Sequence, residues 1–112
     1  MVRATYFWAI LTIALSCFLT ACAVSHQYIA EALQHAERAV TYGELKDTNA
    51  LAEQATVALR YAHLAEKNMQ TDGQLQEAIM ELKEAVRHAR YGRSDAGMRA
   101  AEKAATLLGE LQ

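Results

Sequence analysis

The chain has 112 residues, and its 11 lysines and arginines against 13 aspartates and glutamates give a net charge of −2. This balance lacks the basic excess of a nucleic-acid-binding protein, so we expect no nucleic-acid partner. The sequence has no proline, only 5 glycines and abundant alanine, which favours helix and excludes a β-sandwich or barrel. A chain of this length supports one domain.

The N-terminus has the layout of a secretory signal. Arg3 gives a short basic start, residues 6–19 are apolar apart from two hydroxyl side chains, and small residues precede Cys22. The apolar run is shorter than the roughly 20 residues that a membrane-spanning helix needs. Cys17 and Cys22 are the only cysteines, which excludes a disulfide scaffold or a metal site built from several thiolates.

The letters LTAC at 19–22 resemble the signal of bacterial lipoproteins. Proteins of that class are cut just before the cysteine, which receives acyl chains such as palmitate. The resemblance implies a signal peptide over 1–21, a lipid anchor to a membrane at Cys22 and a lipidated linker over 22–27. The class commonly has Asp after the cysteine to retain proteins at the inner membrane. This chain has Ala23, so we expect the outer membrane, facing the periplasm.

Two alternatives to a lipid anchor remain open at this point. An ordinary signal peptide could be cut nearby, or the segment could stay attached as an uncleaved anchor. Several acyl chains on one cysteine would make a lipid anchor stable, because each buried CH₂ contributes about 0.8 kcal/mol.

Residues 28–112 divide into helical segments at glycines and helix-capping residues. Gly43 and Gly92 are expected to end helices, and Asp47 or Thr48 and Ser94 are expected to begin them. The letters TDGQ at 71–74 fit a capping box. We predict helices over 26–42, 48–67, 73–91 and 95–111. Within each, apolar residues recur every three or four positions and form one face, as in Leu75, Ile79, Leu82, Val86 and Ala89.

The two halves of this region resemble each other. EALQHAERAV at 31–40 aligns with EAIMELKEAV at 77–86, and AEQATVAL at 52–59 aligns with AEKAATLL at 101–108. The offset is 46 residues in the first helix of each half and 49 in the second. Two copies of a helical hairpin predict an all-α, antiparallel four-helix bundle with a mostly alanine core. An extended pair of hairpins is the alternative arrangement.

Histidines and glutamates at helical spacing are the candidate metal ligands. Glu31 lies four residues before His35, Glu84 four before His88, and Glu66 three after His63. These spacings place both members of a pair on one helix face. His35 and His88 lie off the apolar faces and are expected to point outwards or along a groove between helices.

The chemistry of these pairs allows two interpretations. Imidazole and carboxylate together suit a divalent transition metal, although two ligands bind weakly and tight sites have three or four. The same side chains also form ordinary solvated faces, with ion-pair gains of about 0.3–0.5 kcal/mol each. Arg38 and Arg87 lie nearby and would repel a cation. No catalytic motif is present, so we expect no enzyme activity.

Three stretches resemble the bacterial small metal-binding protein family: EALQHAERAVTYG (31–43), LAEQATVALRYAHLAEK (51–67) and EAVRHARYG (84–92). The resemblance covers about residues 28–111. It implies a periplasmic four-helix bundle that is built from alanine-rich EAxxHAxxAxxHG repeats and binds divalent metals, copper above all. His35 and His88 keep the family histidine. Other residues stand where that pattern has histidine: Tyr42, Gln54, Tyr61, Glu81, Ala100 and Leu107.

The sequence therefore leads to two hypotheses. The first is a periplasm-facing lipoprotein with a small helical bundle over 28–112 that binds copper, nickel or zinc weakly. Its ligands would be His35, His88, Glu31, Glu81, Glu84 and His63. The second is a non-catalytic module of the cell envelope that has lost metal binding. Its polar helix faces would contact another envelope protein or the cell-wall polymer.

Overall fold

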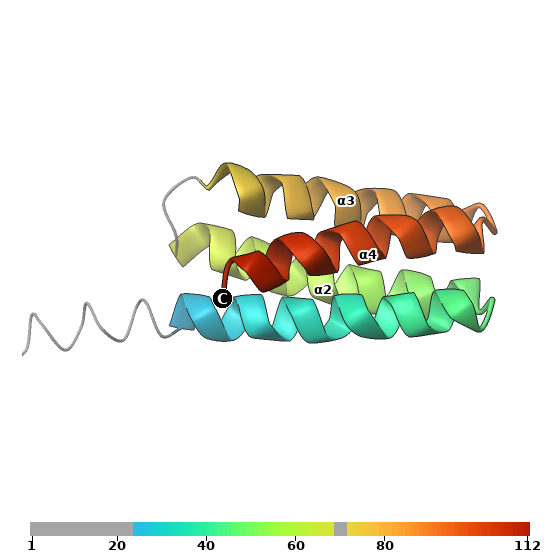
Figure 1. Ribbon diagram of the computed structural model, residues 1–112, viewed down its shortest axis with the longest axis horizontal. Helices are drawn as coiled ribbons and strands as arrows, with labels where there is room; N and C mark the ends of the chain where they lie inside the picture. The colour runs from blue at the N-terminus through green and yellow to red at the C-terminus, as the bar shows by residue number, and fades with distance from the viewer. Residues whose placement is uncertain (1–23, 69–71) are drawn as a thin grey trace, which may run out of the picture.

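The computed structural model describes residues 24–68 and 72–112. The predicted signal segment, Cys22 and Thr71 lie outside these residues. The described chain forms four helices, which are 24–44, α2 (Thr48–Asn68), α3 (Gly73–Arg90) and α4 (Ser94–Glu110). They run up and down beside one another, and Figure 1 shows the C-terminus at the same end of the bundle as the start of helix 24–44. The predicted all-α four-helix bundle is confirmed. The first helix, predicted over 26–42, begins at 24, so it takes up most of the 22–27 stretch assigned to the linker.

Two of the predicted helix caps need correction. Asp72 is the N-cap of α3, and its carboxylate accepts hydrogen bonds from the backbone N–H groups of Gln74 and Leu75. The predicted capping box is wrong, because the N-cap is Asp72, and the Gln74 amide donates to the backbone oxygen of Leu107 and to Glu110 in α4. At α4 the N-cap is Arg93, without a side-chain hydrogen bond, and Ser94 is already the first helical residue.

The first hairpin turn differs from the predicted one. Gly43 does not end the first helix, which continues to residue 44. The chain turns at Lys46, whose φ of 60° is in the left-handed region, and the carboxylate of Asp47 then caps α2 by accepting from the N–H of Ala50 at 3.0 Å. In the second turn Gly92, with φ of 75°, follows α3 as predicted.

Gly43 has a packing role instead. A Cβ added there would lie 2.6 Å from Cβ of Met98 in α4 and 3.1 Å from Cδ1 of Leu51 in α2. Real Cβ atoms essentially never approach other atoms this closely, so helix 24–44 meets α4 here at a distance that only glycine allows. This contact closes the bundle between its first and last helices.

Alanine dominates the core. Of the twenty buried hydrophobic residues in the described chain, thirteen are alanine, and the largest fully buried side chains there are Ile29, Leu51, Leu75, Leu82 and Leu108. The core divides into two clusters along the bundle, one near the chain ends and one near the two hairpin turns. Small side chains let helix axes approach closely, which brings polar residues at the helix edges within reach of the neighbouring helix.

The two hairpin turns lie at the same end of the bundle (Figure 1). There the Lys46 ammonium forms an ion pair with the Asp95 carboxylate, which joins the first turn to the start of α4. The hydrogen bond and the charge of Lys46 lower the pKa of the Asp95 carboxyl from its ordinary value of 3.8. No helix in the described ranges is both long and apolar enough to cross a membrane.

We expect Gly43→Ala to lower the free energy of unfolding by about 1–3 kcal/mol, because helix 24–44 must move away from Met98. Gly109→Ala is the matched control. Gly109 is an exposed residue of α4 with no atom within 4 Å of an added Cβ. This control should be neutral or stabilising by up to about 1 kcal/mol, owing to the better helix propensity of alanine. Urea denaturation measures the free energy of unfolding of both variants. Equal changes in Gly43→Ala and Gly109→Ala would contradict the close contact between Gly43 and Met98.

We also expect the Lys46–Asp95 pair to contribute stability that depends on pH. Because the folded-state pKa of Asp95 is lowered, the contribution is present above about 3.8 and is lost as the pH falls through the folded-state value. Asp95→Asn should therefore melt below the wild type at neutral pH, by a small margin for so exposed a pair. The gap should close in acid. Melting curves between about pH 2 and 7 measure this, with Glu44→Gln, an exposed carboxylate without an ion pair, as the control.

Candidate metal-binding groove and its repeat-related seam

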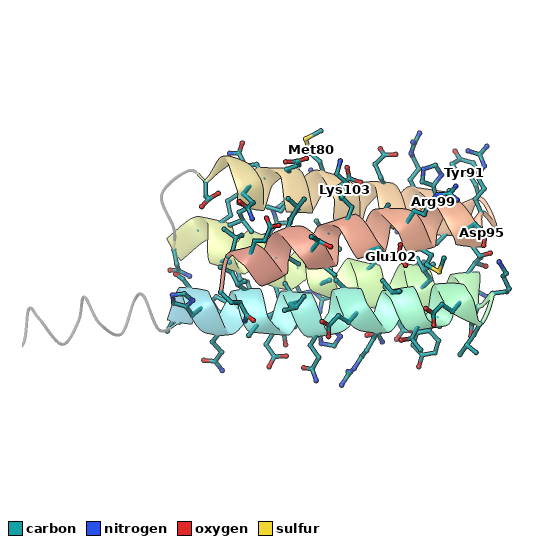
Figure 2. All side chains as sticks on the ribbon, in the orientation of Figure 1. Met80, Tyr91, Asp95, Arg99, Glu102 and Lys103 are labelled. Carbon is teal, nitrogen blue, oxygen red and sulfur yellow. The ribbon has the colours of Figure 1, made fainter. Side chains whose placement is uncertain are left out.

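An open groove of about 570 Å³ runs between α3 and α4, and we call it the α3/α4 groove. Glu81, Glu84 and His88 reach it from α3, where spacings of three and four residues place them on one helix face. On the α4 side it is lined by Ala96, Arg99, Ala100 and Lys103. Figure 2 shows Arg99 and Lys103 following one another along α4, with Tyr91 near the turn end. Three of the predicted ligands therefore share one groove.

Glu84 and His88 form the one predicted histidine–glutamate pair that the described residues bring together. His88 Nε2 lies 3.6 Å from Glu84 Oε2, and the His88 side chain is 22% exposed. Metal–nitrogen and metal–oxygen distances of about 2.0–2.2 Å put neighbouring ligand atoms about 3–3.5 Å apart. The pair is thus close to the spacing that one metal ion requires. Arg87 pairs with the same Glu84 oxygen, so a metal ion would have to displace an exposed guanidinium.

The other ring nitrogen of His88 has no partner. Nδ1 is buried and makes no hydrogen bond within the described chain. A ligating histidine usually donates its second N–H to a carbonyl or carboxylate, which fixes the orientation of the ring. The α4 side chains that line the groove with His88 are two alanines, an arginine and a lysine, and none of them can accept a hydrogen bond. The missing partner favours weak rather than tight metal binding.

His35 lies elsewhere, at the seam between helix 24–44 and α2, which we call the first seam. Its Nδ1 is 2.8 Å from Oε1 of Gln54, and its ring stacks on Tyr61 with centroids 5.7 Å apart and an interplanar angle of 8°. An amide oxygen only accepts, so Nδ1 carries the proton and the lone pair of the neutral ring is on Nε2. The seam therefore orients His35 as a single nitrogen ligand. His35 was expected to point outwards or along a groove between helices, and this position agrees with the second of these.

The remaining predicted ligands are not assembled with these two. No ion pair joins Glu31 to His35, or Glu66 to His63, in the described part of the chain, and Glu31 and His63 are half-buried on helix 24–44 and α2. Nor does any group of three His, Cys, Asp and Glu side chains within 24–68 and 72–112 come close enough to hold a metal ion. Four of the six predicted ligands thus lie in two separate places, Glu81, Glu84 and His88 in the α3/α4 groove and His35 at the first seam, and Glu31 and His63 join neither.

Lys103 holds the carboxylate of Glu81. Its Nζ lies 2.9 Å from Glu81 Oε1 and 3.6 Å from Glu77 Oε1, so the ammonium bridges two carboxylates one turn apart on α3. The hydrogen bond to Glu81 raises the pKa of Lys103 above its ordinary value of 10.5, and the charges of Glu81 and Glu77 raise it further. Lys103 therefore stays charged at neutral pH, and Glu81 is already paired with a cation.

The contacts across the two hairpins follow the internal repeat. With offsets of 46 and 49, the His35–Gln54 pair of the first seam corresponds to the Glu81–Lys103 pair of the α3/α4 groove. A second pair follows the same offsets, at the seven-residue spacing on each helix. The Tyr28 and Tyr61 rings, with centroids 6.4 Å apart, correspond to Gln74 and Glu110, which share a hydrogen bond of 2.9 Å. The duplicated sequence thus produces duplicated contacts with different chemistry.

Sequence reasoning missed Gln54 and Lys103 as parts of these places. Their signal was present in the alignment of 52–59 with 101–108, which pairs them directly. The family pattern has histidine at Gln54 and at Ala100, but the two positions differ in the structure. Ala100 is 8% exposed in the core, whereas Lys103 makes the cross-hairpin contact. The counterpart of Gln54 by contact is therefore Lys103.

A small, alanine-rich, four-helix bundle with histidine and glutamate at its helix seams is the class of protein that these observations define. The family model described as small metal-binding protein matches residues 3–110. The chain therefore belongs to the small metal-binding protein family, and this membership supports metal binding as its general function. No curated protein matches the chain.

Proposed function

We propose that this protein is a periplasm-facing lipoprotein that binds a divalent transition metal weakly, at Glu84 and His88 in the α3/α4 groove. The observation that carries the proposal is the 3.6 Å separation of His88 Nε2 and Glu84 Oε2 in an open groove. Water or a second molecule would complete the coordination shell. Copper, nickel and zinc are the candidate ions, since each accepts imidazole nitrogen, and Cu²⁺ should bind most tightly of the three.

His35 contributes a second and separate point of attachment. Gln54 and Tyr61 fix its ring, so little conformational entropy is lost when Nε2 binds a metal ion. One nitrogen alone binds more weakly than the Glu84–His88 pair. Glu31 and His63 stay as accessory ligands in this proposal, because each is half-buried rather than enclosed, and a side-chain rotation could bring it to the ion.

The lipid anchor agrees with the orientation of the bundle. Helix 24–44 starts two residues after Cys22 in the sequence, so acyl chains there would attach the bundle by the end opposite its hairpin turns. The α3/α4 groove would then open sideways into the periplasm. The Ala23 that follows Cys22 favours the outer membrane as the site of attachment.

A second candidate function is an envelope module that contacts another protein or the cell-wall polymer. It is favoured by Leu45 and Tyr91, which are 69% and 72% exposed in the two hairpin turns. Arg93 lies over the Tyr91 ring at 5.7 Å. These side chains would form the end of the bundle farthest from an anchor at Cys22. Such a module would be indifferent to metal.

We expect isothermal titration of the full chain in detergent with Cu²⁺, Ni²⁺ or Zn²⁺ to show binding at about micromolar affinity or weaker, as two protein ligands allow. His88→Ala should weaken the main event about ten-fold or more, because it removes the nitrogen ligand. His35→Ala should remove only a weaker, second event.

His26→Ala is the matched control, because His26 is an exposed histidine on helix 24–44 outside both places, and it should leave both events unchanged. Equal losses of metal affinity in His88→Ala, His35→Ala and His26→Ala would mean that metal binds nonspecifically to any histidine, which would contradict the proposed site. A wild-type chain whose titration and melting temperature stay the same at millimolar metal would favour the envelope module.

We expect mass spectrometry of the protein from bacterial membranes to find an N-terminus at Cys22 carrying acyl chains. Cys22→Ser should lose the added mass and leave the membrane fraction, while Cys17→Ser, within the predicted signal peptide, should change neither. Residues 1–21 still attached to a bare Cys22 thiol would contradict the lipoprotein assignment.

A further inference from the structure

The α3/α4 groove and the first seam are related by the internal repeat, yet only one of them contains its own cation. In the first seam the cross-hairpin residue from α2 is Gln54, a neutral amide. In the α3/α4 groove the equivalent residue from α4 is Lys103, an ammonium (Figure 2). The repeat thus provides an internal comparison of the same position with and without a positive charge.

The Lys103 ammonium occupies the place that a metal ion would take between Glu77 and Glu81. These carboxylates are four residues apart on one face of α3, and Nζ contacts one oxygen of each, at 3.6 and 2.9 Å. Two carboxylates held together in this way attract a cation, and Lys103 supplies it from within the chain. Glu81 is also the most covered of the three side chains, with 22% exposure, so its charge is the one that most needs a partner.

We propose that Lys103 is the specificity-determining residue of the α3/α4 groove, where its ammonium replaces a divalent metal ion at Glu77 and Glu81 and limits metal binding to the neighbouring Glu84–His88 pair. This deepens the proposed function and rests on it. Arg99 lines the same groove and Arg87 pairs with Glu84, so a metal ion at His88 has three positive charges nearby, counting Lys103. Of the two cations that line the groove, Lys103 is the one that also holds a carboxylate of it.

Removing the Lys103 charge should open the groove to metal. In Lys103→Gln, which copies the residue of the first seam, Ni²⁺ affinity should rise about five-fold, because a unit charge is lost close to the ion and Glu81 is released. In Lys103→His an imidazole faces Glu77 and Glu81 from α4 and supplies a third ligand. We expect a gain of about ten-fold or more there, and a new Ni²⁺ absorption band.

Three controls separate this role from a structural one. Lys83→Gln removes the same charge from an exposed lysine of α3 without an ion pair, and should leave Ni²⁺ affinity unchanged. Lys103→Arg keeps the charge and should bind as the wild type does. Adding Glu81→Gln to Lys103→Gln removes the released ligand and should cancel most of the gain. Circular dichroism before titration checks that each variant is folded.

The titration of full-length variants with Ni²⁺ decides the proposal. An equal gain in Lys83→Gln and Lys103→Gln would make the effect one of net charge and overturn it, as would no gain in a folded Lys103→His chain. The outcome also distinguishes this inference from the proposed function. If Lys103→Gln binds Ni²⁺ and the wild type does not, the role of Lys103 is supported and native metal binding is rejected. If both bind Ni²⁺ equally, native metal binding is supported and the role of Lys103 is rejected.

Discussion

Alanine sets the geometry of this bundle. Thirteen of the twenty buried hydrophobic residues within 24–68 and 72–112 carry only a methyl group, so the four helices must lie close together to exclude water. Where Gly43 meets Met98, the contact leaves no room even for a Cβ. A core of this kind buries little apolar area per residue. Its stability therefore depends on maintaining the short distances between helices, and a single misplaced methyl group disturbs more than one of them.

Close packing has a consequence for the polar residues at the helix edges. Side chains that would otherwise extend into water reach the neighbouring helix and contact side chains there. His35 reaches Gln54, and Glu81 reaches Lys103, although each pair is formed by residues about 20 positions apart in the sequence. The duplication of the hairpin gives both halves the same frame of contacts. Substitutions within that frame then determine whether a position holds a metal ligand, an aromatic ring or an ion pair.

The two halves differ in the chemistry of their edge positions while the frame of helices stays the same. Gln54 and Glu81 are half-buried at helix edges, whereas Tyr61 also packs against the core. In the α3/α4 groove the Glu81–Lys103 pair balances charge within the chain. Residues at the helix edges therefore set the chemistry of each seam, while the buried alanines and leucines hold the fold.

The sequence alone determined the elements of this protein. Apolar residues at intervals of three and four gave four helices with ends correct to within about two residues. The repeat gave their pairing into hairpins. The errors were local, because capping depends on which donor a side chain can reach. Asp72 caps α3, since its carboxylate accepts from the N–H groups of Gln74 and Leu75, and the Gln74 amide donates to α4.

Tertiary structure decided which of the candidate ligands meet. Spacing along one helix put Glu31 near His35 just as it put Glu84 near His88, yet only the second pair comes into contact. The reason is competition from the facing helix, where Gln54 and Tyr61 take the ring of His35, while the alanines opposite His88 offer nothing and leave it to Glu84. Helical periodicity determines the face on which a side chain lies. The partner it chooses depends on the neighbouring helix, whose position is fixed only when the bundle closes.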